Sequence, residues 1–201
     1  HNGHLRPALE IQQWLNVSQV SLIPSKSPVH RDAPGCTSEQ RLAMVEAAVA
    51  DEPALRADAR EVTSDKPSYT VLTLQGLREE LGDTMPICMV MGMDAYLSLP
   101  GWHQWQQILD YAHLIVVARP GYHFEPDETM QDFTRDHRVH DAAVMLSKPA
   151  GHVLIHEMTP LGISATQVRQ LVTDGYSPRY LLPDPVWAYI QDNNLYGYIT
   201  N

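Results

Sequence analysis

The amino-acid sequence predicts an α/β fold in which a parallel sheet is flanked by helices. Two observations lead to this prediction. Short apolar runs of strand length alternate along the chain with longer segments whose apolar residues recur at helical spacing, which is typical of α/β proteins. Two of the runs, Ile87–Met91 and Leu114–Ala118, are wholly apolar, which is the pattern of parallel strands covered on both faces.

The N-terminal segment is expected to form a helix and then a short strand. Apolar residues recur at helical spacing over Leu5–Leu15, and Pro7 is tolerated there because the first helical turn needs no N–H donor. Gln19–Ile23 has the length and composition of a strand, and residues 24–34 are expected to be a polar loop punctuated by prolines.

Two further elements are expected before the middle of the chain. Thr37 and Gln40 have the spacing of a capping box, so a helix should open there and run through Ala50. Arg60–Val62 lies in a polar stretch and is interpreted as an edge strand.

The rest of the chain alternates strands and helices. A helix is expected over Tyr69–Leu81, with Gly82 as its stop signal. Residues 121–148 are acidic and weakly periodic, and we interpret them as a variable insertion rather than as part of a site. The remaining expected elements are a helix at Trp102–Leu109, a strand at Val153–Ile155, and helices at Ser164–Thr173 and Asp184–Gln191.

Length and composition indicate an ordinary globular protein of one domain, residues 1–201. The chain has 201 residues, of which 44% are hydrophobic and 19% charged. No apolar run reaches the length of a membrane span, and the first residues do not form a signal segment. Cys36 and Cys88 lack metal-ligand spacing, so we interpret them as small hydrophobic residues in a reducing, cytoplasmic setting.

The distribution of charge points to a small anionic ligand. A formal net charge of -10 argues against a nucleic-acid partner, because that affinity comes mostly from basic residues that meet phosphates. The first 31 residues nevertheless carry Arg6, Lys26 and Arg31 against the single acid Glu10. A locally basic patch on an acidic protein suits a small anion better than a long polyanion.

The first motif is His1-Asn2-Gly3-His4, which places two imidazoles at the start of the first helix. Gly3 permits a close approach of backbone and phosphate. Neither histidine has a serine or cysteine beside it to activate, which argues against a covalent nucleophile. The expected role of His1 and His4 is to donate hydrogen bonds to phosphate oxygens as charge develops in a transition state. The alternative is a pair of surface histidines or a tag remnant.

The second motif runs from Ile163 to Arg169 and reads Ile-Ser-Ala-Thr-Gln-Val-Arg. Ser164 is a good helix N-cap, and the free N–H groups of the first turn form an anion site. The Thr166 hydroxyl can add a donor, and the Arg169 guanidinium can project toward a phosphate. The alternative is an ordinary capped amphipathic helix with Arg169 on its solvated face.

The position of the histidine motif also predicts sequence ahead of it. Open α/β sheets bind ligands beyond the carboxyl ends of their strands, often at a loop that leads into a helix N-terminus. His1–His4 occupies such a loop, so we expect a central first strand and its loop upstream of residue 1. On this interpretation the chain as written lacks its first strand and should not be a competent enzyme.

The pair of motifs, in this order, resembles the nucleotidyltransferases with an H-x-G-H motif. Class I aminoacyl-tRNA synthetases share the first motif, but the lysine-rich loop that follows it in them is not found here. Further segments resemble the bacterial nicotinate-nucleotide adenylyltransferase family, and they occur in the family's order. They are residues 24–31, 66–70, 92–94, 100–105, 118–121 and 181–186.

This resemblance implies a Rossmann-like nucleotidyltransferase fold and a reaction of NAD biosynthesis. The adenylyl group of ATP would pass to nicotinate mononucleotide, and deamido-NAD and pyrophosphate would leave. The partners would be ATP and nicotinate mononucleotide, with neither nucleic acid nor membrane. Mg²⁺ is expected as the cofactor that arrives with ATP, held mainly by phosphates rather than by a protein metal site.

The resemblance also implies a role for each matching position. His1, His4 and Arg169 would be catalytic, with Ser164 and Thr166 on the leaving phosphates. Asp94 would accept from the ribose hydroxyls, and Trp102 would stack on the pyridine ring. Gly3 and Ile163 complete the expected ATP site, and Lys26, His30, Arg31, Thr70, His103 and Arg119 complete the expected mononucleotide site. Backbone N–H groups near Thr70 and His103 would receive the carboxylate, and His30, Arg31 and Arg119 would neutralise the phosphate.

Other interpretations of these residues stay open. Trp102 and Trp105 have the spacing of core anchors, Asp94 could only cap a helix, and His30-Arg31 could be solvated charge. The family commonly has a second proline where this chain has Val29. A sister transferase acting on nicotinamide mononucleotide or phosphopantetheine is the alternative enzyme, and a nucleotide-binding sensor without catalysis is the alternative of another class.

Overall fold

The computed structural model describes residues 1–26, 35–118, 124–159 and 161–199. The chain folds into two compact units, one formed by residues 1–68 and 161–201 and the other by residues 69–160. We call them the terminal unit and the central unit. Among the described helices, none is both long and apolar enough to cross a bilayer.

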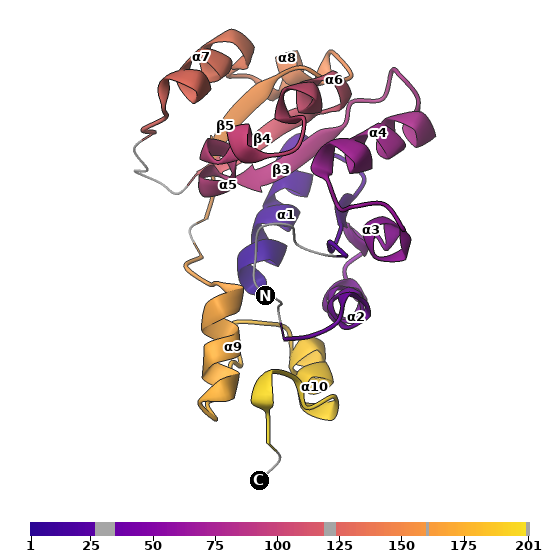
Figure 1. The fold of residues 1–201 in the computed structure, drawn as a ribbon, viewed down its shortest axis with the longest axis vertical. Helices are drawn as coiled ribbons and strands as arrows, with labels where there is room; N and C mark the ends of the chain where they lie inside the picture. The colour runs from indigo at the N-terminus through magenta and orange to yellow at the C-terminus, as the bar shows by residue number, and fades with distance from the viewer. Residues whose placement is uncertain (27–34, 119–123, 160, 200–201) are drawn as a thin grey trace. The chain divides into compact units, whose positions relative to one another are not determined.

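The terminal unit combines the two ends of the chain, the indigo and the orange to yellow segments of Figure 1, with a short parallel sheet. Val20 pairs with Leu55 in that sheet. The buried Ala8 of the first helix packs in one core cluster with Val49 and Leu55. The elements are α1 (Asn2–Leu15), β1 (Val20–Leu22), α2 (Ser38–Val49), β2 (Leu55–Ala57), α3 (Arg60–Thr63), α9 (Ala165–Thr173), α10 (Asp184–Asp192) and a 3₁₀ turn at Leu195–Gly197.

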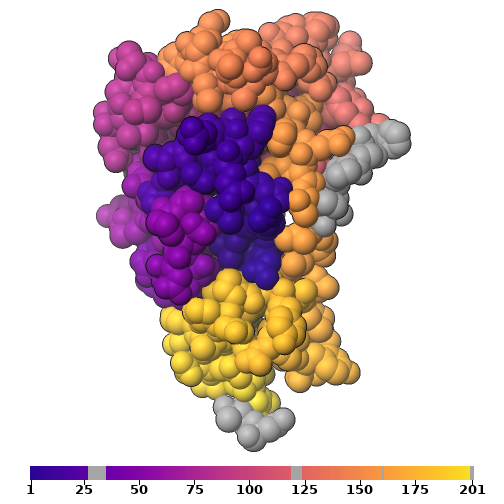
Figure 2. Space-filling model, turned by 180° about the vertical axis from the view of Figure 1, so that it is seen from behind, coloured from indigo at the N-terminus to yellow at the C-terminus, as the bar shows by residue number. Residues whose placement is uncertain are grey.

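The C-terminal helices of this unit share a second apolar core. Val168 and Val172 of α9 pack in one buried cluster with Trp187 and Ile190 of α10. The N-terminal residues (indigo), α2 (purple) and the C-terminal residues (yellow) adjoin one another in Figure 2. The two chain ends therefore contribute to one packed unit, although about 160 residues separate the two motifs in the sequence.

The central unit is a parallel three-stranded sheet with helices around it, in the strand order β3-β4-β5 (Figure 1). β4 is its middle strand, and Leu114, Ile115 and Val116 are fully buried. The elements are α4 (Thr70–Leu81), β3 (Cys88–Gly92), α5 (Met93–Leu97), 3₁₀ turns at Leu99–Gly101 and Trp105–Gln107, α6 (Ile108–Tyr111), β4 (His113–Ala118), α7 (Glu128–His137), α8 (Ala142–Leu146) and β5 (Val153–Glu157).

A buried arginine joins four segments of the central unit. The Arg78 guanidinium donates to the carbonyl oxygens of Gly82, Met85, Tyr111 and Pro149 at 2.6 to 2.9 Å. Its side chain therefore satisfies four backbone acceptors that water does not reach easily, which is the arrangement that makes a buried guanidinium tolerable.

Most predicted elements are confirmed, and their start and stop signals act as expected. Thr37 Oγ1 accepts from the N–H of Gln40 at 3.2 Å, and the Gln40 side chain accepts from the N–H of Thr37 at 2.9 Å, so the capping box is present. Gly82 ends α4 with a φ of 81°, a value that favours glycine. Parallel pairing of the strands is confirmed as well.

Pro7 lies farther inside α1 than expected. The helix begins at Asn2 rather than at Leu5, so Pro7 stands beyond its first turn. Proline has no N–H to donate to the carbonyl of Gly3 four residues earlier. The first turn of α1, which carries both histidines, is therefore joined to the rest of the helix by one hydrogen bond fewer than in a helix without an internal proline.

Two predictions of local structure are wrong. Arg60–Val62 is helical, within α3, because Asp58 accepts from the N–H of Arg60 at 3.0 Å and turns the chain there; the strand lies at Leu55–Ala57. The helix expected over Trp102–Leu109 is instead a 3₁₀ turn at Trp105–Gln107 followed by the start of α6, since Gln104 has a left-handed φ of 49°. The segment 121–148 contains α7 and α8, which begin at the side-chain caps Asp127 and Asp141, and its interpretation as a variable insertion stays a prediction.

Candidate active site

Gly3 brings the two motifs together within the terminal unit. A Cβ atom placed on Gly3 would lie 2.8 Å from the backbone oxygen of Ile163 and 3.0 Å from Nδ1 of His1. Real Cβ atoms essentially never approach a backbone oxygen that closely. The first turn of α1 can therefore lie against the entry to α9 only because residue 3 has no side chain.

The two histidines form a stacked pair beside this contact. The ring centroids of His1 and His4 are 4.0 Å apart, with an angle of 24° between the ring planes. Nδ1 of His1 is buried and has no hydrogen-bond partner among the described residues. A buried imidazole nitrogen without a protein partner is costly to leave unpaired, and a bound ligand oxygen would satisfy it.

Asn2 fixes the start of α1 from the other side, a role that the sequence did not indicate. Its backbone N–H donates to the carbonyl of Leu181 at 2.9 Å, and its side-chain amide donates to the carbonyl of Tyr180 at 3.0 Å. Asn2, which occupies the x position of the H-x-G-H motif, thus holds the first turn of α1 against the segment that follows α9. No local sequence signal reveals this, because the partners lie some 180 residues away.

The N-terminus of α9 has the features expected of an anion site. Ser164 is its N-cap, and Oγ of Ser164 accepts from the N–H of Gln167 at 3.1 Å. The side chains of Thr166 and Arg169 are joined by a hydrogen bond of 3.2 Å from the guanidinium to the hydroxyl. Since Ser164 and Thr166 are exposed, the first turn presents its N–H groups, a hydroxyl and a guanidinium together.

The C-terminal end of α9 is fixed through Tyr196. The Thr173 hydroxyl lies 3.0 Å from the carbonyl of Arg169 and 3.1 Å from that of Tyr196, and it donates to them. Burial raises the pKa of the half-buried Tyr196 phenol, and the positive charge of Arg169 opposes that rise. The backbone oxygen of Tyr196 thus helps to hold the last turn of α9 in place.

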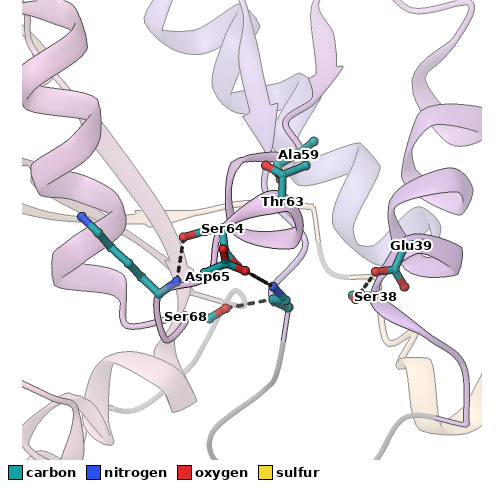
Figure 3. A network of polar contacts seen from close by, with 9 residues as sticks. Ser38, Glu39, Ala59, Thr63, Ser64, Asp65 and Ser68 are labelled. Atoms are coloured by element: carbon teal, nitrogen blue, oxygen red, sulfur yellow. Dashed lines mark hydrogen bonds and ion pairs between the residues drawn. The ribbon is translucent and has the colours of Figure 1, made fainter.

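Lys26 uses its ammonium within the protein. Nζ donates to the carbonyl of Ser64 at 2.6 Å and lies 3.5 Å from the Asp65 carboxylate, and the backbone N–H of Lys26 donates to Oγ of Ser68 at 3.1 Å. Figure 3 shows Ser64, Asp65 and Ser68 gathered on the turn that follows α3. Lys26 thus joins two of the segments that carry the resemblance, 24–31 and 66–70. Its predicted contact with the mononucleotide stays a prediction.

In the central unit, a ring stack brings together the two expected carboxylate-binding segments. The rings of Tyr69 and His103 are stacked, with centroids 4.3 Å apart and 24° between their planes. Tyr69 is the N-cap of α4, so Thr70 opens the helix and its N–H needs no helical partner. The stack places His103 beside Tyr69, the residue that precedes Thr70, and the binding of a carboxylate by N–H groups there stays a prediction.

The two tryptophans differ in their packing. Trp105 meets Phe133 edge-on, with ring centroids 5.0 Å apart, which is the arrangement of a core anchor. Trp102 is half-buried against the same apolar cluster and lies in an extended conformation outside any helix. Both side chains are half-buried against this cluster, so the packing of both fits the core interpretation, and the stacking of Trp102 on a pyridine ring stays a prediction.

Asp94 lies where a strand ends and a helix begins. It is in the first turn of α5, directly after β3, and it is exposed. Gly92, not Asp94, is the N-cap of that helix, so the simple capping role considered for Asp94 is wrong. Its carboxylate lies at the carboxyl end of a parallel strand, where open α/β sheets bind ligands.

The remaining predicted site residues, His30, Arg31 and Arg119, lie outside the described residues. Within the described part of the chain, no group of three histidine, cysteine, aspartate or glutamate side chains is placed to hold a metal ion. Cys88 is half-buried in β3, and burial raises the pKa of its thiol to about 11, which fits its interpretation as a small hydrophobic residue.

The terminal unit therefore offers imidazoles, backbone N–H groups, hydroxyls and a guanidinium at one place. These are all donors, and none of them is a carboxylate. Such a set binds an oligophosphate and can stabilise the charge that develops when one of its P–O bonds breaks.

Comparisons with known proteins agree with this chemistry. A family model described as cytidylyltransferase-like matches residues 1–171. A protein of Aeromonas salmonicida with the name "Probable nicotinate-nucleotide adenylyltransferase" is 46% identical over 98% of this chain and 91% of its own length. Proteins of the same name from Hahella chejuensis and from Pseudomonas putida strain W619 are 46% and 43% identical, each over 98% of this chain and 90% and 89% of their lengths.

Solved structures show the same fold at much lower identity. The Plasmodium falciparum nicotinic acid mononucleotide adenylyltransferase complexed with NaAD matches with a TM-score of 0.69 and 13% identity, over 98% of this chain and 91% of that one. The same enzyme complexed with APC matches with a TM-score of 0.64 and 14% identity, over the same shares of both chains. The nucleotidyltransferase fold predicted from the sequence is confirmed.

Proposed function

The chain belongs to the nicotinate-nucleotide adenylyltransferase family of cytidylyltransferase-like proteins, and from this we propose that it transfers the adenylyl group of ATP to nicotinate mononucleotide. The products are deamido-NAD and pyrophosphate, and the reaction belongs to NAD biosynthesis. The observation that best supports it is the close approach at Gly3, because it joins the histidine turn of α1 to the phosphate-binding turn of α9.

The chemistry requires positioning and charge stabilisation rather than a covalent enzyme intermediate. A phosphate oxygen of the mononucleotide attacks the α-phosphorus of ATP, a new P–O bond forms, and the bond to the β-phosphate breaks. The electron pair of that bond leaves with pyrophosphate. His1 and His4 would donate hydrogen bonds to the reacting phosphate, and the unpartnered Nδ1 of His1 favours such a ligand.

The leaving group would be held by α9. The first-turn N–H groups behind Ser164, the Thr166 hydroxyl and the Arg169 guanidinium suit the β- and γ-phosphates, whose negative charge grows as the bond breaks. Gly3 and Ile163 would line this ATP site through their backbones. Arg169 is held by Thr166, so its guanidinium is oriented before ATP arrives.

Asp94 would belong to the ATP site, where its carboxylate would accept from ribose hydroxyls. The acceptor would be recognised by Trp102, which would stack on the pyridine ring, and by the N–H groups near Thr70 and His103, which would bind its carboxylate. His30, Arg31 and Arg119 would neutralise the phosphate of the mononucleotide. A reducing, cytoplasmic setting fits Cys36 and Cys88, which form no disulfide.

Mg²⁺ would enter with ATP. The groups that the two motifs offer are imidazoles, hydroxyls, N–H groups and a guanidinium, which suit phosphate oxygens and not a hard cation. The ion would therefore take its ligands from the triphosphate, and it would lower the charge of the leaving group when bound.

Pyrophosphate release from Mg-ATP tests this proposal. The full-length protein is given nicotinate mononucleotide, nicotinamide mononucleotide or phosphopantetheine in parallel reactions, and the dinucleotide product is identified by mass. We expect release with nicotinate mononucleotide at the highest kcat/KM. A preference for either other acceptor would favour the sister transferase, and binding of ATP without release for any acceptor would favour the sensor.

A further inference from the structure

We propose that the turn at residues 178–181 positions His1 and His4, and that Tyr180 contributes to this through its backbone conformation. This inference rests on the proposed function. It gives a role to the start of the segment 181–186, which carries the family resemblance but supplies no residue to the proposed reaction. Tyr180 acts through Asn2, so it is a positioning residue and not a catalytic one. All the contacts concerned lie within the terminal unit.

A hydrogen bond and a left-handed residue define the 178–181 turn. The N–H of Leu181 donates to the carbonyl of Pro178 at 3.1 Å, which closes a four-residue β-turn. Tyr180, the third residue of this turn, has a φ of 71°. In type II turns the third residue needs a positive φ, and glycine or asparagine usually stands there. A bulky tyrosine in this conformation is strained, so the surrounding contacts must hold it.

The two carbonyls that follow the bend both accept from Asn2. The backbone N–H of Asn2 donates to the carbonyl of Leu181 at 2.9 Å, and its side-chain amide donates to that of Tyr180 at 3.0 Å. The N–H of Asn2 opens α1 and has no acceptor within the helix, so Leu181 satisfies it. Because the φ of Tyr180 sets the direction in which the chain leaves the turn, it also sets where these two acceptors lie.

The turn is fixed on its other side to the apolar core of α9. Leu182 follows the turn directly, is 4% exposed, and packs in one cluster with Val168 and Val172 of α9. Pro178, the first residue of the turn, is buried as well. The acceptors for Asn2 therefore belong to a fixed support that also packs against the helix expected to hold the phosphates.

Asn2 stands between the two histidines, so its contacts act directly on the turn that carries them. The rings of His1 and His4 are stacked, with centroids 4.0 Å apart. Gly3 permits the close approach of this turn to the Ile163 carbonyl, whereas the two bonds from Asn2 hold the turn in place. Donors that stabilise a developing charge must be in position before the reaction, so a shift of this turn should lower the rate.

The test replaces Tyr180 by residues with opposite backbone preferences. Valine is β-branched and disfavours a positive φ, whereas asparagine adopts it readily. We expect Tyr180→Val to lower kcat about tenfold, through a shift of the histidine turn, and to change the Kd for ATP by less than about twofold. Tyr180→Asn should keep both values close to those of the unchanged protein. Equal losses of kcat in the two variants, or none in Tyr180→Val, would overturn the proposal.

Tyr176→Val is the matched control. Tyr176 lies on the same connection between α9 and α10, is 66% exposed, and has a negative φ that valine can adopt. The substitution should change neither kcat nor the Kd for ATP. A loss of kcat as large as that in Tyr180→Val would show that the backbone conformation of Tyr180 is not the cause, and it would overturn the proposal.

Asn2→Ala tests the same contact from the histidine turn. It removes the donor to the Tyr180 carbonyl and should lower kcat about threefold, as expected for one hydrogen bond. In the double variant with Tyr180→Val, the loss should be smaller than the product of the two single losses, because both changes disturb one contact. Independent effects, or an unchanged kcat in Asn2→Ala, would count against the proposal. Asn2→Ala alone keeps it testable where Tyr180→Val does not fold.

Hydrogen exchange separates this inference from the proposed function. The amide of Asn2, followed by NMR, should exchange faster in Tyr180→Val than in the unchanged protein, whether or not the protein turns over substrate. An inactive natural protein with this change in exchange would overturn the proposed function alone. An active natural protein whose Asn2 amide is unaffected by Tyr180→Val would overturn the positioning role alone.

Discussion

Gly3 is the residue at which the two motifs meet, and its lack of a side chain permits the contact. Gly3→Ala places a Cβ against the Ile163 carbonyl and forces α1 and α9 apart. Because a displacement of reacting groups by about 1 Å can cost about 100-fold in rate, we expect a loss of kcat/KM of that order. Overpacking should also lower the free energy of unfolding by about 1–3 kcal/mol.

Gly76→Ala is the matched control for this prediction. Gly76 lies in the middle of α4, and a Cβ placed on it meets nothing within 4 Å. The substitution should raise the free energy of unfolding by roughly 0.5–1 kcal/mol, as alanine does for glycine in a helix, and leave activity unchanged. A Gly3→Ala protein that behaved like Gly76→Ala would show that the motifs need no close approach.

His4 is predicted to act on the transition state more than on bound ATP. His4→Ala should lower kcat by about 100-fold or more, the usual cost of a lost donor at a developing charge, and weaken ATP binding far less. Steady-state kinetics with ATP binding measured by calorimetry would separate the two effects. Equal losses in turnover and in ATP affinity would show that His4 only binds substrate.

At the scale of elements, Ser164 is predicted both to stabilise α9 as its N-cap and to order the turn that would hold the phosphates of ATP. Ser164→Ala removes the acceptor for the N–H of Gln167, so it should lower the free energy of unfolding by about 1 kcal/mol. It should also raise KM for ATP, because the first turn that would hold the phosphates loses its order. Urea unfolding and steady-state kinetics measure the two effects.

Asp127→Ala is the control, since Asp127 caps α7 through the N–H of Met130 at 2.8 Å. It should cost about the same stability without a change in KM for ATP. If Asp127→Ala raised KM for ATP as much as Ser164→Ala does, the rise in Ser164→Ala would come from its lower stability alone.

The elements that the sequence predicted well are those whose signals are local. The capping box at Thr37, the stop at Gly82 and the N-cap at Ser164 each act through bonds within four residues, and all three are confirmed. β2 was missed because Leu55–Ala57 becomes a strand through its pairing with β1, some 35 residues earlier. The local sequence of such a short strand fits a turn or a helix equally well.

At the scale of the whole molecule, stability should fall in acid because of His113. This buried side chain is held neutral: Nε2 lies 2.9 Å from the carbonyl of Lys148 and donates to it, and Nδ1 accepts from the N–H of His152. Burial lowers the pKa of His113 below its ordinary value of 6.5, and the nearby charge of Arg78 acts in the same direction.

The sign of the effect follows from which state binds the proton. Above pH 6.5 both states keep His113 neutral, and its contribution is fully present. Below that value the unfolded chain takes up a proton that the folded chain resists, so the free energy of unfolding falls as the pH falls through the folded pKa.

Urea unfolding at about pH 7.5 and about pH 5 measures this loss. His113→Gln cannot titrate, so it should reduce the difference between the two values, even if it is less stable at both. A pH dependence that is unchanged in His113→Gln would assign the acid lability to other groups.

The sequence by itself determined the fold class, most helices, the parallel strands and both motifs, because periodicity and caps act over a few residues. Only the tertiary structure decided what those residues touch. It placed the Ile163 carbonyl against Gly3, turned the Lys26 ammonium onto Ser64, and joined Asn2 to the carbonyls of Tyr180 and Leu181. These contacts join residues far apart along the chain, and the energy of such contacts depends on a geometry that exists only once the whole unit has folded.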